Sequence, residues 1–155
     1  MIIAPTYTGR QYWLTTVISG LLLCVLLSIA YIACYHHLHV ESSYLFSILY
    51  LIPFVWLSIT LAFFKNRFVW SEFSYGKAFL MSFLSGIIGS VLYSCVIFLI
   101  FDYLGMGSRM GLYENGRVMR DLFSPQATAI SMLIINVILS LVYSLIIAIF
   151  ARKKN

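Results

Sequence analysis

The sequence predicts an all-α polytopic membrane protein, a four-transmembrane-helix bundle with both termini in the cytoplasm. Four apolar runs, each 21 to 25 residues long, contain no Asp, Glu, Lys or Arg. A helix rises about 1.5 Å per residue, so each run is long enough to cross the roughly 30 Å hydrocarbon core of a bilayer. A helix also satisfies its own backbone hydrogen bonds, which lipid cannot do. The expected helices are residues 13–35, 44–64, 78–101 and 127–151.

Cationic residues outside these runs predict the orientation. Of the ten Lys and Arg residues, seven lie in the N-terminal arm, in the connection 65–77 or at the C-terminus, and three lie in the connection 102–126. Short loops that carry more Lys and Arg usually face the cytoplasm. We therefore expect the connection 102–126 at the outer surface.

The composition predicts a single integral membrane domain over residues 1–155. Charged residues make up 10% of the chain, whereas soluble proteins carry about 25%. The longest polar stretch, residues 105–126, is too short to form a core of its own. The net charge of +5 comes from residues at helix ends. The lipid bilayer is therefore the expected partner of these charges, and nucleic acid is not expected to bind.

The first two connections predict a hairpin and an interfacial segment. The connection 36–43 is short, so the first two helices are expected to pack as a tight hairpin. Pro53 removes one backbone hydrogen bond from the second helix and predicts a kink. The connection 65–77 combines cations with rings, as is typical of a segment at headgroup depth. Its aromatic residues are Phe68, Trp70, Phe73 and Tyr75.

The third connection is longer and of mixed charge. Apolar and charged residues are interspersed between Leu112 and Phe123, which predicts a short amphipathic helix on the outer surface. Ser124 and Pro125 follow, a pair that is typical of the first residues of a helix. The last membrane helix is expected to begin close to this pair.

Small and weakly polar residues recur every four positions in three of the predicted helices, so they share one face of each helix. Lipid supplies no hydrophobic force between helices, and close backbone approach must replace it. The rows therefore predict a packing face inside the bundle; the alternative is the polar lining of a path for a solute. The three rows are Thr16, Gly20, Cys24 and Ser28; Ala78, Ser82, Gly86, Ser90 and Ser94, with Ser85 and Gly89 beside them; and Asn136, Ser140, Ser144 and Ala148.

Eight of these residues form the candidate site: Gly20, Ser82, Gly86, Gly89, Ser90, Asn136, Ser140 and Ser144. Asn136 is its most polar member, and an amide in hydrocarbon needs a hydrogen-bond partner. We expect Asn136 to face the bundle interior, where it bonds to another helix or, alternatively, contacts a ligand. Ile97 is expected on the lipid face of the third helix.

His36, His37 and His39 lie close to Cys34 and Glu41 at the outer end of the first hairpin. Imidazole, thiolate and carboxylate groups bind zinc or copper, which makes the histidines weak candidates for a metal site. No second matched set of ligand residues accompanies them in the sequence. A polar cap on a tight turn is the favoured interpretation, and no cofactor is expected.

Two segments resemble a known family. Residues 74–79 (Ser-Tyr-Gly-Lys-Ala-Phe) lead into the third run, and residues 144–150 (Ser-Leu-Ile-Ile-Ala-Ile-Phe) precede a basic C-terminus. With the length and the four runs, these segments resemble the domain of unknown function 4199 family of bacterial membrane proteins. The resemblance covers nearly the whole chain. It implies four helices and the bacterial cytoplasmic (inner) membrane, and it carries over no activity.

The sequence predicts no enzyme and no catalytic residue. No motif for hydrolysis or nucleotide binding is present, and no serine inside a run has a His or Lys partner at membrane depth. Pumps usually keep a charged residue inside the membrane, and the four runs hold none. We expect an assembly, sensory or accessory subunit that packs as a homo-oligomer or with a membrane protein partner. The alternative is a small oligomeric transporter or channel module for an uncharged or lipophilic solute.

Overall fold

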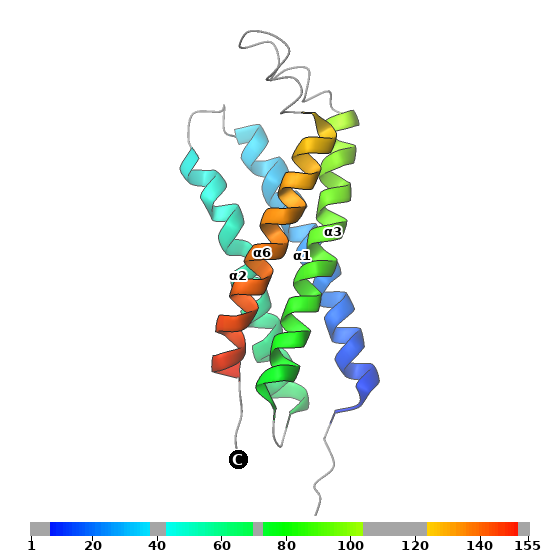
Figure 1. Ribbon diagram of the computed structural model, residues 1–155, viewed down its shortest axis with the longest axis vertical. Coiled ribbons are helices and arrows are strands. Elements are labelled where there is room, and N and C mark those ends of the chain that lie inside the picture. The colour runs from blue at the N-terminus through cyan, green and yellow to red at the C-terminus, as the bar shows by residue number, and fades with distance from the viewer. Residues whose placement is uncertain (1–6, 38–42, 70–72, 104–123, 152–155) are drawn as a thin grey trace, which may run out of the picture.

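The computed structural model describes residues 7–37, 43–69, 73–103 and 124–151. Its four helices are α1 (Gly9–His37), α2 (Ser43–Phe68), α3 (Tyr75–Tyr103) and α6 (Pro125–Ala151). They alternate in direction, so α1 begins and α6 ends at the same end of the molecule (Figure 1). The predicted all-α four-helix bundle is confirmed.

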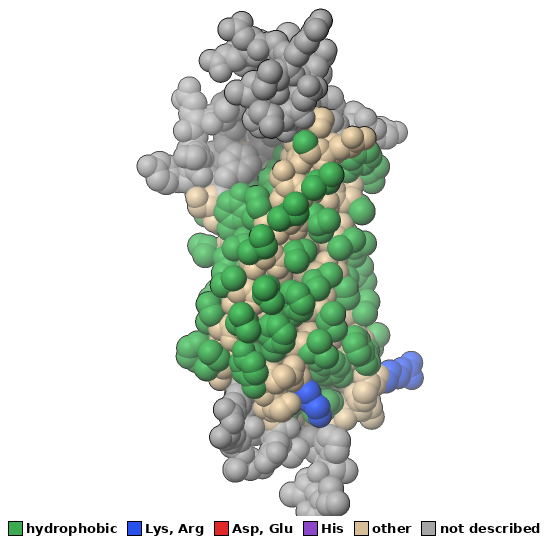
Figure 2. Space-filling view, viewed as in Figure 1, with side chains coloured by type: hydrophobic (Ala, Val, Ile, Leu, Met, Phe, Trp, Pro, Cys, Tyr) green, Lys and Arg blue, Asp and Glu red, His purple; other side chains and the backbone are tan. Residues whose placement is uncertain are grey.

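Each of these helices is long and apolar enough to cross a membrane. Large apolar side chains cover the outside of the bundle (Figure 2), and many are more than half exposed, among them Ile29 at 60% and Ile149 at 63%. In a bilayer such a surface contacts acyl chains, whereas in water it would favour aggregation. The protein is therefore a multi-pass membrane protein. The candidate spans are Gly9–Cys34, Ser47–Phe68, Tyr75–Ile100 and Gln126–Ala151.

A capping box makes α1 longer than its apolar run. The helix begins at Gly9, before the predicted start at Trp13. Thr8 Oγ1 accepts a hydrogen bond from the Gln11 N–H at 3.3 Å, and Gln11 Oε1 accepts one from the Thr8 N–H at 2.9 Å. This reciprocal pair satisfies two backbone donors at the helix start.

α2 and α3 extend beyond their charge-free runs. α2 continues to Phe68, beyond the predicted end at residue 64, and α3 begins at Tyr75, before residue 78. Lys65 and Arg67 occupy the last turn of α2. Cations there interact favourably with the negative end of the helix dipole, and their long side chains reach the headgroups.

α6 begins at the predicted pair Ser124–Pro125, two residues before the expected start at residue 127. The helix begins at Pro125, and Ser124 Oγ accepts a hydrogen bond from the Ala127 N–H at 3.2 Å. Because α3 continues to Tyr103, the connection before α6 is shorter than the predicted 102–126. The amphipathic helix expected between residues 112 and 123 lies outside the described residues.

α3 is the centre of the bundle. Its interfaces with α6, which runs antiparallel to it, and with α1, which runs parallel to it, are the most extensive among the described helices. α2 contacts the other three helices less extensively. The candidate site on α1, α3 and α6 therefore lies where the helices pack most closely.

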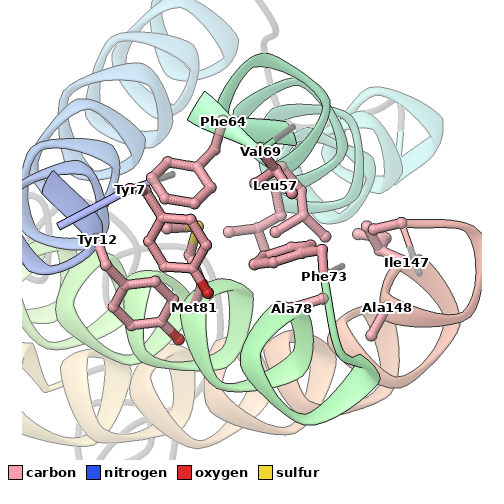
Figure 3. Close-up of a cluster of buried hydrophobic side chains, with 12 residues drawn as sticks. Tyr7, Tyr12, Leu57, Phe64, Val69, Phe73, Ala78, Met81, Ile147 and Ala148 are labelled. Carbon is pink, nitrogen blue, oxygen red and sulfur yellow. The ribbon is translucent and has the colours of Figure 1, made fainter. Parts of the chain in front are cut away.

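Large rings fill the end of the bundle at which α1 begins (Figure 3). The aromatic cluster consists of Tyr7, Tyr12, Phe64 and Phe73 with the aliphatic residues around them. The ring centre of Phe64 lies 5.3 Å from that of Tyr7 and 5.9 Å from that of Phe73. Lys77 Nζ lies 5.5 Å from the Tyr7 ring centre, a cation–π distance. Phe73, one of the rings expected at headgroup depth, is completely buried in this cluster.

A second cluster of apolar side chains fills the opposite half of the bundle. It includes Leu23, Leu27, Leu49, Tyr93 and Ile97. Ile97 is completely buried, so the expectation that it faces lipid is wrong. The third run is apolar all round, and such a helix has no periodic signal that separates lipid-facing from buried large residues.

Candidate functional site

The predicted rows of small residues face the interior of the bundle. Asn136 shares the buried face of α6 with Ser140 and Ser144, and it is 4% exposed. Every residue of the candidate site is buried. The set is Gly20, Ser82, Gly86, Gly89, Ser90, Asn136, Ser140 and Ser144.

α3 and α6 meet at Gly86 and Ser140. A methyl group built on Gly86 would lie 2.5 Å from Ser140 Cβ and closer still to Ser140 Oγ, far inside van der Waals contact. The two helices are antiparallel, so four residues forward on α3 correspond to four residues backward on α6. This contact therefore sets the register of both rows. The pairs at matching levels are Ser82 with Ser144 and Ser90 with Asn136.

α1 and α3 meet at Gly20 and Gly89. A methyl group on Gly20 would lie 2.7 Å from Ile88 Cβ, and one on Gly89 would lie 2.8 Å from Leu23 Cδ2. The methyl group on Gly89 would also lie 3.1 Å from the Gly20 carbonyl oxygen. All three glycines of the candidate site thus lie where a side chain would overlap a neighbouring helix.

Two serine hydroxyls of α3 bond to the backbones of its neighbours. Ser85 Oγ donates to the Thr16 carbonyl oxygen of α1 at 3.0 Å. Ser94 Oγ donates to the Ala129 carbonyl oxygen of α6 at 2.7 Å. A hydroxyl can reach a neighbouring backbone only where the helices approach closely, so these bonds depend on the small residues beside them.

Polar groups of α2 that the sequence analysis missed bond to α1. The hydroxyls of Ser19 and Thr60 lie 2.8 Å apart, and Trp56 Nε1 donates to the Ser19 carbonyl oxygen at 3.0 Å. α2 has no row of small residues that would have marked this face. The spacing of Trp56 and Thr60, four residues apart, was the available signal.

Other polar groups of the candidate site bond within their own helix. Ser82 Oγ and Ser90 Oγ each donate to the carbonyl oxygen four residues earlier, at 3.0 Å and 2.6 Å. Asn136 Nδ2 donates to the Met132 carbonyl oxygen at 2.8 Å. One N–H of the amide that was expected to bond to another helix therefore donates within α6.

Ser140 and Ser144 differ from the other serines of the site. Both hydroxyls are completely buried, and neither has a hydrogen-bond partner among the described residues. A serine inside a helix commonly donates to the carbonyl one turn earlier. A buried polar group without a partner costs free energy, so these hydroxyls are the groups of the site best suited to meet a ligand.

α6 also supports α2 beside its proline. Pro53 is buried and has no N–H, so the carbonyl four residues earlier loses its intrahelical partner. The Tyr143 hydroxyl of α6 donates to the Tyr50 carbonyl oxygen, in the turn before the proline, at 2.9 Å. The Tyr143 ring packs edge-to-face on Phe54 at 5.3 Å.

A shallow, largely open hollow lies at the end of α2. Two rings and two polar side chains line it: Phe63, Asn66, Arg67 and Phe68. Phe63 and Phe68 pack edge-to-face with ring centres 6.4 Å apart. The sequence predicts an interfacial segment around Phe68 but no site there.

The candidate metal site lies outside the described part of the chain. The side chains of His36 and His37 and all of His39 are not described. The described residues contain no group of three or more potential metal ligands. Cys24, Cys34 and Cys95 form no disulfide in the described structure.

No protein-family model, curated protein or solved structure matches this chain. The resemblance to the domain of unknown function 4199 family therefore stays a prediction. Inferences about function rest on the contacts, burial and charges of the chain itself.

Proposed function

We propose that this chain is a non-enzymatic membrane protein that serves as an assembly, sensory or accessory subunit. The observation that carries the proposal is the close packing at the glycines, where methyl groups on Gly20, Gly86 or Gly89 would overlap a neighbour. A solute path needs free volume between the polar rows. Here the rows hold α1, α3 and α6 together, which supports a packing role.

The subunit is proposed to act with a second copy of itself or with a membrane protein partner. Its small residues are used inside the chain, so a partner would contact the large apolar side chains on the outside. Van der Waals contact and displaced lipid would then drive association.

Purification of the full chain in a mild detergent tests the proposal. Native mass spectrometry should find a discrete oligomer or a membrane protein partner in fixed stoichiometry. Liposomes that contain the protein should pass glycerol no faster than empty liposomes in a stopped-flow light-scattering assay. A monomer without a partner that conducts glycerol would contradict the proposal.

The proposed location is the bacterial cytoplasmic membrane, with both termini in the cytoplasm. The location rests on the family resemblance, and the orientation rests on the excess of Lys and Arg at one end of the bundle. Reporter fusions after Asn155 and within residues 65–77 should report the cytoplasm, and a fusion near Gly111 should report the outer side. Export of the Asn155 fusion would show that the orientation is reversed.

A small oligomeric transporter or channel module for an uncharged or lipophilic solute is the second candidate. The buried hydroxyls of Ser140 and Ser144, which have no described partner, favour it. The variant Asn136→Leu distinguishes the two candidate functions, because Asn136 lies on the same face of α6 as Ser140 and Ser144. A variant that keeps its thermal stability but loses solute flux would favour the transporter. A variant with unchanged oligomeric state, and with no flux in either form, would favour the packing subunit.

A further inference from the structure

We propose that the hollow at the end of α2 binds an anionic phospholipid. Arg67 and Asn66 would hold the headgroup phosphate, and Phe63 and Phe68 would contact the upper part of an acyl chain. This proposal is independent of the proposed function, because either kind of membrane protein can carry a lipid site.

The hollow lies at headgroup depth. The candidate span of α2 runs from Ser47 to Phe68, so its last turn is the place where hydrocarbon gives way to headgroups. Phe63 is one turn deeper than Arg67 in the helix, and its side chain is 55% exposed. Phe63 therefore lies on the hydrocarbon side of Asn66 and Arg67. Phe68 follows them in the helix, and its ring packs against that of Phe63 with centres 6.4 Å apart.

The apolar wall of the hollow, formed by these two rings, is anchored to the core of the bundle. Phe68 packs between two rings of α2, with its ring centre 6.4 Å from that of Phe63 and 5.4 Å from that of Phe64. Phe64 is completely buried in the aromatic cluster. A wall held in this way binds an acyl chain without the entropic cost of ordering it first.

The charge at this end of the bundle suits an anion. Lys65 and Arg67 lie in the last turn of α2, and Lys77 lies in the first turn of α3. The residues from 65 to 77 hold these three cations and one acidic residue, Glu72. Figure 2 shows Lys and Arg at this end of the described surface. The helix terminus contributes only about half a negative charge, so the two cations of the last turn outweigh it.

The side chains favour a lipid over a free phosphate. Arg67 has the planar guanidinium that binds phosphate oxygens in pairs, and Asn66 adds an amide donor beside it. A free phosphate would gain nothing from contact with the two rings, because it has no apolar part. A phospholipid contacts both the polar groups and the rings, and an anionic headgroup gains from the surrounding cations where a zwitterionic one does not.

Native mass spectrometry of the full chain in mild detergent tests the proposal. The probes are palmitoyl-oleoyl phosphatidylglycerol, which is anionic, and palmitoyl-oleoyl phosphatidylcholine, which is zwitterionic. The wild type should bind phosphatidylglycerol more tightly. Arg67→Gln should weaken that binding about fivefold, since one cation near an anionic lipid contributes about that factor. Arg67→Lys should keep the preference for the anionic lipid.

Three comparisons make the test decisive. Arg10→Gln removes a cation that does not line the hollow, and it should change the affinity less than twofold. Phe63→Ala should weaken the binding of both lipids. Millimolar inorganic phosphate should not displace phosphatidylglycerol.

The opposite results would overturn the proposal. Equal binding by wild type and Arg67→Gln would show that the hollow is not the site. An equal loss in Arg10→Gln would show a diffuse charge effect. Displacement by inorganic phosphate would show an ion site instead of a lipid site. Thermal unfolding of each variant without added lipid checks that its fold is intact, and an unfolded Arg67→Gln would be replaced by Arg67→Met.

Discussion

Helices pack in opposite ways in two regions of the bundle. Along α3 they meet through small residues, and at the end where α1 begins they are separated by the large rings of the aromatic cluster. At Gly86, a single added methyl group would lie 2.5 Å from Ser140 Cβ. In the aromatic cluster, by contrast, whole rings with centres 5.3 to 6.4 Å apart fill the space between α1, α2 and α3.

The position of each region along the membrane normal explains the difference. In the hydrocarbon core, a buried ring gains nothing over a ring in lipid, so helices associate by close contact between backbones. At the end of the spans, water and headgroups restore the hydrophobic force, and a buried ring gains free energy in proportion to its area. Rings therefore stabilise the end at which α1 begins, whereas the faces of small residues along α3 depend on close contact between backbones.

The largest expected effect is the loss of a ring from the aromatic cluster. Phe64→Ala should lower the free energy of unfolding by about 3–5 kcal/mol, because it removes apolar contacts and leaves a cavity among Tyr7, Tyr12 and Phe73. Thermal unfolding in detergent measures the effect. Phe150→Ala is the matched control, since that ring is 79% exposed. Equal stability of the two variants would mean that the cluster does not hold the bundle end together.

The next largest effect is expected where the helices meet at glycine. Gly86→Leu should destabilise the fold by about 1–3 kcal/mol, because α3 and α6 must separate to admit the side chain. Gly76→Leu, in the same helix, is the control, since a Cβ at Gly76 would meet nothing within 4 Å. If the two substitutions shift the melting temperature by the same amount, the close contact between Gly86 and Ser140 does not contribute to the stability of the fold.

A smaller effect is expected where a large residue joins α2 to the rest of the bundle. Tyr143→Phe removes the hydroxyl that bonds to the Tyr50 carbonyl and keeps the ring on Phe54. Hydrogen bonds inside membranes contribute about 0.6 kcal/mol on average, so the global loss should be of that size. Amide hydrogen exchange should rise in the turn before Pro53 and stay unchanged in α3. An equal rise in amide hydrogen exchange in α2 and α3 would show that this bond does not stabilise α2 locally.

The smallest effect is expected at Ser140. Ser140→Ala should leave stability unchanged or raise it slightly, because its hydroxyl has no described partner and lies against Gly86. Ser85→Ala is the contrasting variant, and it should lose about 0.6 kcal/mol with its bond to α1. A clear loss of stability in Ser140→Ala would point to a hydrogen bond that the structure does not show.

The four helices and the buried faces of three of them followed from local patterns. A charge-free run of more than 20 residues predicts a span wherever it lies in the chain. The four-residue spacing from Asn136 to Ser140 and Ser144 predicts one shared face from the geometry of the helix alone. The capping box at Thr8 was also visible in the sequence, but hydropathy draws attention to the apolar part of a helix and misses its polar start.

Other features could not be predicted from local patterns. Phe73 and Ile97 lie in segments rich in apolar residues, where burial and lipid contact favour the same residue types. The hollow beside Arg67 depends on Phe68 packing against Phe64, and composition indicates an interface without indicating a concave surface. Thr60 and Trp56 bond to Ser19, a residue about 40 positions earlier in the chain.

The sequence by itself determined the four long apolar helices of the described residues, their approximate limits and the face of small residues on α1, α3 and α6. These properties depend on neighbours within one or two helical turns. Only the tertiary structure decided that Gly86 lies against Ser140, that Gly89 lies against the Gly20 carbonyl, and that the rings of Phe64 and Phe73 close one end. Register and partner choice depend on contacts between distant segments, and apolar runs of similar composition favour many pairings almost equally until their side chains are packed.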